Sequence, residues 1–397
     1  MSENRHLPGE LKQLQSLPLE YKILMTEERI KAWYQAWTKF TIMDKETGKT
    51  RFVTIDARDF HWNDAKERFN MKDSEYIEAE EPGQVYVSFS GGKDSTVLMH
   101  IVDSIYGDVP ALFVNTGLEY PEIQAFAKRV QRGEYDCFNS DVVVVRPDIH
   151  FDEVLKKHGY PVVSKRVASY VNTAKRNPDS KRAKWIRGEE WTLFVTGGKW
   201  THLIDAPFLV SDQCCNVMKK NPAKKYQKET GRRPMFGTMA QESTSRLNMW
   251  VQYGCNGFDR KDPVSNPLSF WTEQDILHYI KKYDVPYCPV YGDIQIKRTV
   301  DNDRAMEGQM NVIDYLGCYE PEDTLETTGC HRTGCIFCMF GCHLEKEPNR
   351  FQRLKQTHPR QYDYCINGGE MVDGKWQPNK EGLGLGKVLD YIGVKYD

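Results

Sequence analysis

The chain has 397 residues, 40% of them hydrophobic and 28% charged, with a formal net charge of -2. With a mean hydropathy of -0.64, this composition is typical of a folded globular protein, and it argues against a disordered chain and a globally basic nucleic-acid binder. No apolar run approaches the roughly 18 residues of a membrane span, and the N-terminus lacks the apolar core of a signal peptide. We therefore expect a cytoplasmic protein of two or three domains, with no membrane partner.

Residues 1–80 are predicted to form a small N-terminal segment of their own. Tyr21–Lys39 has the spacing of a helix, and Thr41–Arg58 predicts a hairpin that turns within DKETGK. The acidic stretch Asp73–Gly83 is interpreted as a linker that closes this segment.

From Gln84 onward, short apolar runs alternate with stretches of helical spacing. The predicted strands are Val85–Ser90, Ala111–Gly117, Val142–Pro147 and Pro234–Ala240, and the predicted helices are Asp94–Ile105, Pro121–Gln131 and Thr272–Tyr283. The order strand–helix–strand–helix–strand, with strands too apolar to be half exposed, predicts a doubly wound α/β domain with a mostly parallel sheet. We place this domain at residues 81–291, and a Cys-rich C-terminal region at residues 292–397.

The sequence SFSGGKDS stands where a predicted strand ends and a helix begins. Its glycines allow a sharp turn whose N–H groups can bind an anion, and the helix N-terminus adds its positive end. Lys93 supplies a positive charge, and Asp94 could hold Mg²⁺. The loop is not a Walker A motif, because Val87 stands where that motif has its first glycine. The predicted phosphate-binding residues are Ser88, Ser90, Gly91, Gly92, Lys93, Asp94 and Ser95.

A Gly-rich turn between a strand and a helix can also be a plain connection, but a plain connection would not require Lys-Asp-Ser at the helix start. Three later stretches extend the pattern: NTGLEYPEI (115–123), FGTMAQESTSR (236–246) and NPLSFWTEQDILHYIKKYDVPYCPVY (266–291). With the loop, they resemble the adenine nucleotide α-hydrolase-like superfamily, whose pyrophosphate loop reads SGGxDS, and within it the PAPS reductase family. Asn115 replaces an acidic residue of the family pattern, and Met239 replaces an arginine.

The resemblance implies an adenine nucleotide as ligand, either ATP or the sulfonucleotides APS and PAPS. It adds Asn115, Thr116, Gly117, Gly237, Glu242 and Ser243 to the nucleotide-binding residues. It also implies a catalytic role for Arg246 beside Lys93 and Asp94. The helix 272–283 is expected to be part of the core and is given no catalytic role.

Eleven cysteines, an odd number, point to metal or redox chemistry rather than to disulfides in a reducing compartment. By spacing alone, the run Cys330, Cys335, Cys338 and Cys342 suits a structural zinc site and an iron–sulfur cluster equally. Bacterial APS reductases of the same family hold a [4Fe-4S] cluster by an adjacent cysteine pair and a distant CxxC. Cys214, Cys215, Cys335 and Cys338 match that pattern.

The resemblance therefore implies a [4Fe-4S] cluster on these four cysteines, because adjacent thiolates reach separate iron corners more easily than one tetrahedral ion. Some thiolating relatives draw their ligands from a C-terminal run instead, and Cys318 and Cys330 would then join Cys335 and Cys338. Cys342 is a further alternate ligand. Zinc and uncoordinated thiols stay open as alternatives.

Two basic runs stand out from the nearly neutral chain. Residues 164–188 carry eight Lys or Arg against one Asp, and residues 219–233 carry seven against one Glu. Either run alone could be a solvated helix face, but together they predict a surface for a polyanion such as DNA or tRNA.

Two features separate the reactions of the family. APS and PAPS reductases carry a catalytic cysteine in a C-terminal ECGxH motif, which this chain lacks, with Cys342 and Cys365 as the late substitutes. The reductases also commonly degrade the loop, which is intact here. We therefore predict an ATP-pyrophosphatase-type sulfur-transfer enzyme that adenylates and thiolates an acceptor, with a cysteine desulfurase or a thiol reductant as partner. The alternatives are an assimilatory APS/PAPS reductase that releases sulfite, and a non-enzymatic nucleotide-sensing or DNA-binding regulator.

Overall fold

The computed structural model describes residues 5–191, 198–297 and 323–397. The chain divides into two compact units, each assembled from segments that are distant in sequence. The first unit is Met1–Phe113, Tyr120–Val144 and Tyr226–Thr333, and the second is Val114–Glu119, Val145–Lys225 and Gly334–Asp397. The division into residues 1–80, 81–291 and 292–397 stays a prediction.

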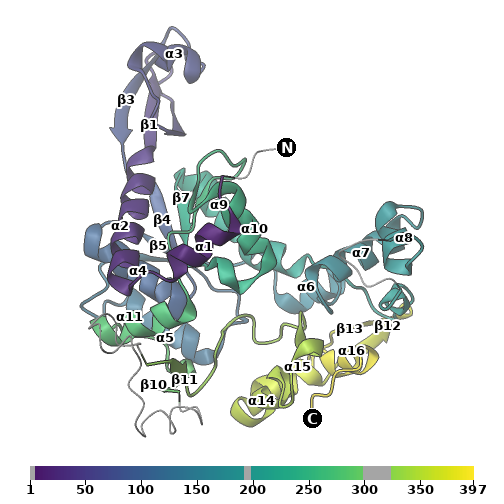
Figure 1. Ribbon diagram of the computed structural model, residues 1–397. Helices are drawn as coiled ribbons and strands as arrows, with labels where there is room; N and C mark the ends of the chain where they lie inside the picture. Colours follow the sequence, from purple (N-terminus) through teal and green to yellow (C-terminus); the bar gives the residue numbers. More distant parts are fainter. Residues whose placement is uncertain (1–4, 192–197, 298–322) are drawn as a thin grey trace, which may run out of the picture. The chain divides into compact units, whose positions relative to one another are not determined.

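A six-stranded sheet with the order β6-β5-β4-β7-β9-β8 forms the centre of the first unit (Figure 1). Its strands are β4 Val85–Phe89, β5 Ala111–Val114, β6 Val142–Val145, β7 Arg233–Phe236, β8 Asn256–Gly257 and β9 Val264–Ser265. β4 pairs in parallel with β5 and β7, β7 pairs in parallel with β9, and β8 is antiparallel to β9. The predicted doubly wound, mostly parallel α/β fold is confirmed.

The helices of this unit bury apolar faces in one core with the sheet. They are α1 Pro8–Gln15, α2 Leu19–Ala36, α4 Lys93–Ile105, α5 Pro121–Gln131, α10 Thr244–Tyr253 and α11 Glu273–Tyr283, and α9 Asn221–Thr230 crosses the boundary between the units. Val85, Tyr86 and Val87 are all buried although successive residues of β4 point to opposite faces, as expected for a strand covered on both faces. The predicted helix 272–283 is confirmed, with Thr272 as its N-cap.

A three-stranded antiparallel sheet, β2-β1-β3, follows α2 (Figure 1). It consists of β1 Trp37–Asp44, β2 Thr50–Asp56 and β3 Glu75–Glu81, with the short helix α3 Ala65–Arg68 packed beside it. The hairpin is confirmed, but the interpretation of 73–83 as a linker is wrong. Ile77 packs against the cluster of Phe40, Ile42 and Phe69, and the acidic side chains belong to an edge strand that needs polar residues toward solvent.

Two predicted boundaries also shift. The first long helix ends at Ala36 rather than Lys39, because Trp37 is extended and pairs with Asp56 across the sheet. The strand predicted at 234–240 is Arg233–Phe236, and the chain then enters a 3₁₀ turn at Ala240–Glu242. A two-stranded antiparallel sheet of β10 Ile294–Ile296 and β11 Leu325–Thr327 also belongs to the first unit.

The second unit is mainly helical. Its elements are α6 Phe151–His158, α7 Lys165–Arg176, α8 Lys181–Arg187, α14 Arg350–Thr357, α15 Pro359–Ile366, α16 Leu385–Tyr391 and the hairpin β12 Glu370–Val372 with β13 Lys375–Gln377. Isolated bridges join its segments, including Val163 with Phe340 and Phe208 with Trp376. No helix among the described residues is long and apolar enough to cross a membrane.

A buried ion pair ties α2 to α11 within the first unit. Lys22 Nζ lies 2.8 Å from both carboxylate oxygens of Asp275, and the two side chains are 2% and 10% exposed. Asp275 also accepts hydrogen bonds from the backbone N–H and the hydroxyl of Thr272. The pair thereby joins α2 to the capped start of α11.

We expect Lys22→Met to lower the free energy of unfolding by about 3 to 5 kcal/mol, because it leaves the Asp275 carboxylate buried without a counter-charge. Urea unfolding monitored by circular dichroism measures this. Lys66→Met is the control, since Lys66 pairs with Asp73 on the surface and its loss should cost less than about 1 kcal/mol. Equal effects of the two substitutions would contradict the assignment.

Candidate active site

The glycine-rich loop lies between β4 and α4, at the carboxyl end of a central parallel strand. β4 ends at Phe89, and α4 begins at Lys93 with Gly92 as its N-cap. Gly91 has a φ of +71°, and a Cβ there would lie 2.9 Å from Ile123 Cγ2, so glycine is required for both conformation and space. The first turn of α4 thus directs backbone N–H groups out of the loop, as an anion site needs.

Hydroxyl groups fix the conformation of this loop. The Ser95 hydroxyl donates to the Gly92 carbonyl at 2.9 Å and accepts from the Ser90 N–H at 3.1 Å. The Thr96 hydroxyl also donates to the Gly92 carbonyl, at 3.0 Å. Ser90 and Ser95, both predicted from sequence, therefore position the loop through contacts with each other.

Tyr291 and Thr333 cover the loop, and the sequence analysis did not identify either of them. The Lys93 N–H donates to the Tyr291 hydroxyl at 3.2 Å, and that hydroxyl lies 2.7 Å from Thr333 Oγ1. Burial raises the pKa of Tyr291, so its hydroxyl stays protonated at neutral pH. Tyr291 is the last residue of the stretch CPVY, which follows α11. Apart from the family resemblance, nothing in the sequence indicated that Tyr291 would lie over the loop.

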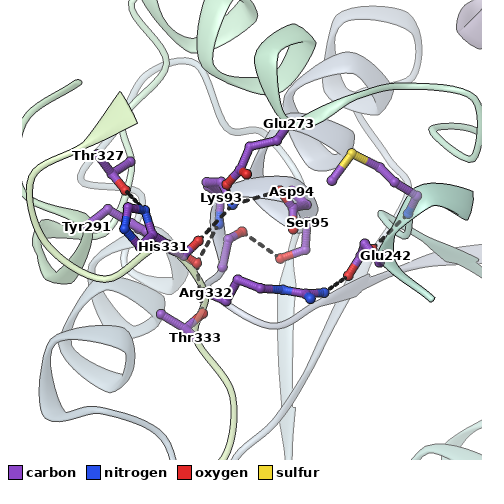
Figure 2. Close-up of polar contacts among 12 residues, drawn as sticks. Lys93, Asp94, Ser95, Glu242, Glu273, Tyr291, Thr327, His331, Arg332 and Thr333 are labelled. Carbon is purple, nitrogen blue, oxygen red and sulfur yellow. Dashed lines mark hydrogen bonds and ion pairs between the residues drawn. The ribbon is translucent and has the colours of Figure 1, made fainter. Parts of the chain in front are cut away.

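The Lys93 ammonium is buried, with its side chain only 4% exposed. It donates to the His331 carbonyl at 3.2 Å and lies 3.2 Å from Glu273 Oε1 and 3.5 Å from Asp94 Oδ1 (Figure 2). Burial raises the pKa of Asp94. Among the described residues, the enclosed Oδ1 of Asp94 has only this ammonium nearby as a donor. The carboxylates of Glu273 and Asp94 thus both lie within ion-pair distance of the Lys93 ammonium.

Gly237 brings the end of β7 against the first turn of α4. A Cβ at Gly237 would lie 2.6 Å from the Asp94 carbonyl oxygen, so no other residue fits without a shift. Glu242 follows in the 3₁₀ turn and forms an ion pair with Arg332 (Figure 2). It also forms an ion pair with Arg246 and accepts from the Met239 N–H at 2.9 Å. Ser243 caps α10 by accepting from the Arg246 N–H. The predicted residues of this stretch therefore share one cluster in the first unit.

Asn115, Thr116 and Gly117 follow β5 and belong to the second unit. The Thr116 N–H and hydroxyl donate to the Glu119 carboxylate at 3.1 and 2.6 Å, and the Gly117 N–H donates to Asn115 Oδ1 at 3.1 Å. The side chains of Asn115 and Thr116 therefore bond within their own turn. Their role toward a nucleotide stays a prediction.

Cys214, Cys215, Cys335 and Cys338 line one small pocket of the second unit. Cys214 and Cys215 enter a π-helical turn at Asn216–Lys220, and their sulfur atoms are 3.9 Å apart. The remaining lining is mostly apolar and consists of Leu118, Phe151, Pro161, Met218, Lys219 and Phe337. The structure thus brings together the two cysteine pairs that the sequence analysis combined across more than a hundred residues.

The electrostatics of this pocket act in both directions on its thiols. The hydrogen bond with Cys215 raises the pKa of Cys214, and burial raises the pKa of Cys338. The Cys214 thiol and Lys165, Lys219 and Lys220 lower the pKa of Cys215. Burial alone would lower the pKa of Lys219, but the neighbouring Cys335 and Glu119 raise it, so this lysine is charged. Burial raises the pKa of Cys335 to about 11. Arg350 donates to the Cys338 carbonyl at 2.8 Å. A thiolate-bound group here would therefore have cations beside it.

The alternate ligands that the structure describes, Cys330 and Cys342, do not line this pocket. Cys342 is buried and its thiol lies 3.0 Å from the Met339 carbonyl oxygen. Cys330 belongs to the first unit, and Cys318 lies outside the described residues. In the described parts of the chain, no three His, Cys, Asp or Glu side chains are arranged to hold a single metal ion, and the ten described cysteines are free of disulfides.

Only part of each basic run faces solvent. In the first run, Lys175 donates to the Ala206 and Phe208 carbonyls, and Lys184 and Arg187 pair with Glu190 and Glu189. In the second run, Lys219 lines the cysteine pocket, and Arg232 and Arg233 contact the Val85 carbonyl and the Trp37 ring. The exposed cations that are left on α7, α8 and α9 include Lys165, Arg176, Lys181, Arg182, Lys225 and Lys228.

A parallel α/β sheet whose central strand ends in a glycine-rich, N–H-presenting loop is typical of nucleotide-binding proteins of the doubly wound class. Comparison with protein families narrows this class, because residues 84–197 and 187–339 match the phosphoadenosine phosphosulfate reductase domain. The chain belongs to the phosphoadenosine phosphosulfate (PAPS) reductase family.

Individual relatives are distant. A phosphoadenosine 5'-phosphosulfate reductase of Xylella fastidiosa is 23% identical over 235 residues, which are 57% of this chain and 78% of that protein. An uncharacterized protein of Methanocaldococcus jannaschii is 34% identical over 208 residues, which are 52% of this chain and 38% of that protein. The crystal structure of PAPS reductase from Candida auris, a phosphate complex, has 17% identity and a TM-score of 0.30 over 52% of this chain and 75% of that chain.

We expect Gly237→Ala to lower the free energy of unfolding by about 1 to 3 kcal/mol, because the new methyl group forces β7 and α4 apart. Denaturant unfolding measures the loss. Gly107→Ala is the matched control, since the nearest atom to its Cβ would be Asn139 Cβ at 3.9 Å. The close approach at Gly237 is disproved if both substitutions have the same effect.

Proposed function

We propose that this member of the family is an ATP-pyrophosphatase-type sulfur-transfer enzyme, which adenylates an acceptor and then replaces the adenylated oxygen with sulfur. The observation that carries the proposal is the intact loop Ser90–Ser95, with N–H groups at the start of α4 and a buried Lys93 ammonium beside the Asp94 carboxylate. Such a loop suits a polyphosphate whose pyrophosphate is the leaving group.

The proposed reaction has two steps. An acceptor oxygen attacks the α-phosphorus of ATP, the bond from that phosphorus to the bridging oxygen breaks, and pyrophosphate leaves. Hydrosulfide then attacks the atom that carries the adenylated oxygen, the oxygen leaves with its bonding electrons as part of AMP, and the sulfur proton goes to solvent. Sulfur delivered as a persulfide by a cysteine desulfurase would in addition need two electrons from a thiol reductant to split its sulfur–sulfur bond.

In the first step, the loop N–H groups would hold the leaving pyrophosphate, and the Lys93 ammonium would neutralise the charge that develops on it. The Asp94 carboxylate, whose buried Oδ1 forms no hydrogen bond with the described residues, fits a Mg²⁺ ion, which prefers a carboxylate together with phosphate oxygens. Arg246, held by Glu242, would bind the phosphate or the acceptor anion. Glu273 would release Lys93 when the phosphates arrive, because they compete for the same ammonium.

The four-cysteine pocket fits an iron–sulfur cluster by its donor set. Four thiol groups share an apolar pocket, and the Lys219 cation lies beside them. Cys214, Cys215, Cys335 and Cys338 would hold a [4Fe-4S] cluster, which when bound supplies electron-transfer and sulfur-binding chemistry. The apolar neighbours Leu118, Phe151 and Phe337 would exclude water from it.

DNA or tRNA is the proposed acceptor class, through the exposed cations of α7, α8 and α9. The second candidate is an APS/PAPS reductase, which is favoured by the relatives with that name. That reaction needs an accessible thiolate as nucleophile. The two late cysteines do not offer one, because Cys342 and Cys365 are buried and burial raises the pKa of both thiols.

We expect the protein to release pyrophosphate from ATP in the presence of nucleic acid, and Lys93→Ala to lower the rate by at least roughly a hundredfold, as loss of a charged transition-state donor does. An enzyme-coupled pyrophosphate assay measures the rate. Lys199→Ala, which removes a lysine remote from the loop in sequence, is the control. ATP that stays intact with DNA and with tRNA, together with thiol-dependent sulfite release from PAPS, would establish the reductase instead.

Anaerobically purified protein is expected to contain about four iron and four sulfide per chain, with the absorption of an iron–sulfur cluster. Cys214→Ser and Cys335→Ser should each lose most of this content, since a serine oxygen is a poor ligand for a soft site. Cys342→Ser should retain it. Retention in Cys214→Ser with loss in Cys330→Ser and Cys318→Ser would identify the alternate ligand set, and zinc in place of iron would exclude the cluster.

A further inference from the structure

A cavity of about 300 Å³ lies in the first unit between α10 and the strands β7, β8 and β9. Its volume is at the lower end for ligand pockets, and large enough for one nucleobase with its phosphate. The polar side chains in its wall are Thr238, Arg246, Tyr253, Arg260, Asn266 and Ser269. Neither the family motifs nor the loop accounts for the part formed by Tyr253 and Arg260.

The guanidinium of Arg260 is the first feature that points to an anionic ligand. Arg260 is half-buried in the cavity wall, and burial lowers its pKa. The Asp262 carboxylate, which favours the charge of Arg260, is on the exposed surface. A half-buried guanidinium in a cavity wall is stabilised by an anion, and phosphate matches its fork geometry.

Aromatic groups beside Arg260 point to a planar ligand. The Arg260 guanidinium lies over the Tyr253 ring at 5.3 Å, and both line the cavity. Trp250 lines it as well and is 3% exposed. A ligand with a flat face could pack against these aromatic rings.

The cavity adjoins the loop through its wall. Thr238 and Met239 line the cavity and directly follow Gly237, which touches the Asp94 carbonyl. Arg246 lines it too and is held by Glu242, which also pairs with Arg332. The carboxylate therefore keeps the Arg246 guanidinium oriented where the cavity and the loop meet.

We propose that this cavity is a second nucleotide subsite, which takes one nucleoside monophosphate unit with its base on Tyr253 and its phosphate on Arg260. The unit is either a free nucleotide or one residue of a nucleic acid strand. Its further assignment as the acceptor to be thiolated rests on the proposed function, whereas the binding itself does not.

The test is calorimetric titration of the full chain with AMP and with a twelve-nucleotide single-stranded DNA, after the loop has been saturated with α,β-methylene-ATP. We expect Arg260→Gln and Tyr253→Leu each to weaken binding by roughly tenfold or more, the loss typical of a charged hydrogen bond or a base stack. Lys261→Gln, which removes the same charge one residue along on the exposed surface, should stay within roughly twofold. Arg260→Lys, which keeps the charge, replaces Arg260→Gln if that variant does not fold.

The ligand source follows from the two titrations: tight AMP binding indicates a free nucleotide, and binding of the DNA alone indicates a residue within a strand. Equal weakening by Arg260→Gln and Lys261→Gln would overturn the subsite, as would inorganic phosphate that binds as tightly as AMP. If Arg260→Gln also weakens the binding of α,β-methylene-ATP, the cavity belongs to the loop site and is not a second subsite. If the protein binds AMP but does not release pyrophosphate from ATP, the subsite stands and only its assignment to the acceptor is wrong.

Discussion

The close contact between β7 and the first turn of α4 is the constraint on which the nucleotide loop depends. Gly237 leaves no room for a side chain beside the Asp94 carbonyl, and Gly91 must adopt a left-handed conformation beside Ile123. These two positions fix where the helix N-terminus points. Because the N–H groups of that turn are the predicted anion site, the direction of the helix sets where an anion could bind.

Charge balance is the second theme of the first unit. Glu273 and Asp94 surround the Lys93 ammonium, and Arg246 and Arg332 surround Glu242. Each of these charges therefore has a partner, which avoids the cost of an isolated ion away from water. Such a site can bind an anion by exchange, since an arriving phosphate can replace Glu273 at the lysine, and the half-exposed Glu273 carboxylate is then solvated by water.

In the cysteine pocket, lysines likewise offset the cost of charge, here on sulfur. Four thiols in an apolar pocket would be costly as thiolates, because burial raises their pKa, as it does for Cys335. Lys219 offsets this cost, and Lys165 and Lys220 act in the same direction on Cys215. The basic run at 219–233 is thus divided: Lys219 and Lys220 act on the thiols, and Arg232 and Arg233 contact the Val85 carbonyl and the Trp37 ring. Lys228 is among its exposed residues.

The sequence alone determined the features that depend on local pattern: the parallel sheet, because its strands are continuously apolar; the loop, because Ser, Gly and Lys stand at a strand–helix junction; and the pairing of Cys214 and Cys215 with Cys335 and Cys338, through the family resemblance. It missed β3, since an acidic edge strand has the composition of a linker. Tyr291 over the loop, Glu273 at Lys93, and the cavity around Arg260 were decided only by the tertiary structure. Each of these joins residues from separate segments, and no local periodicity records which side chains will meet when a chain folds.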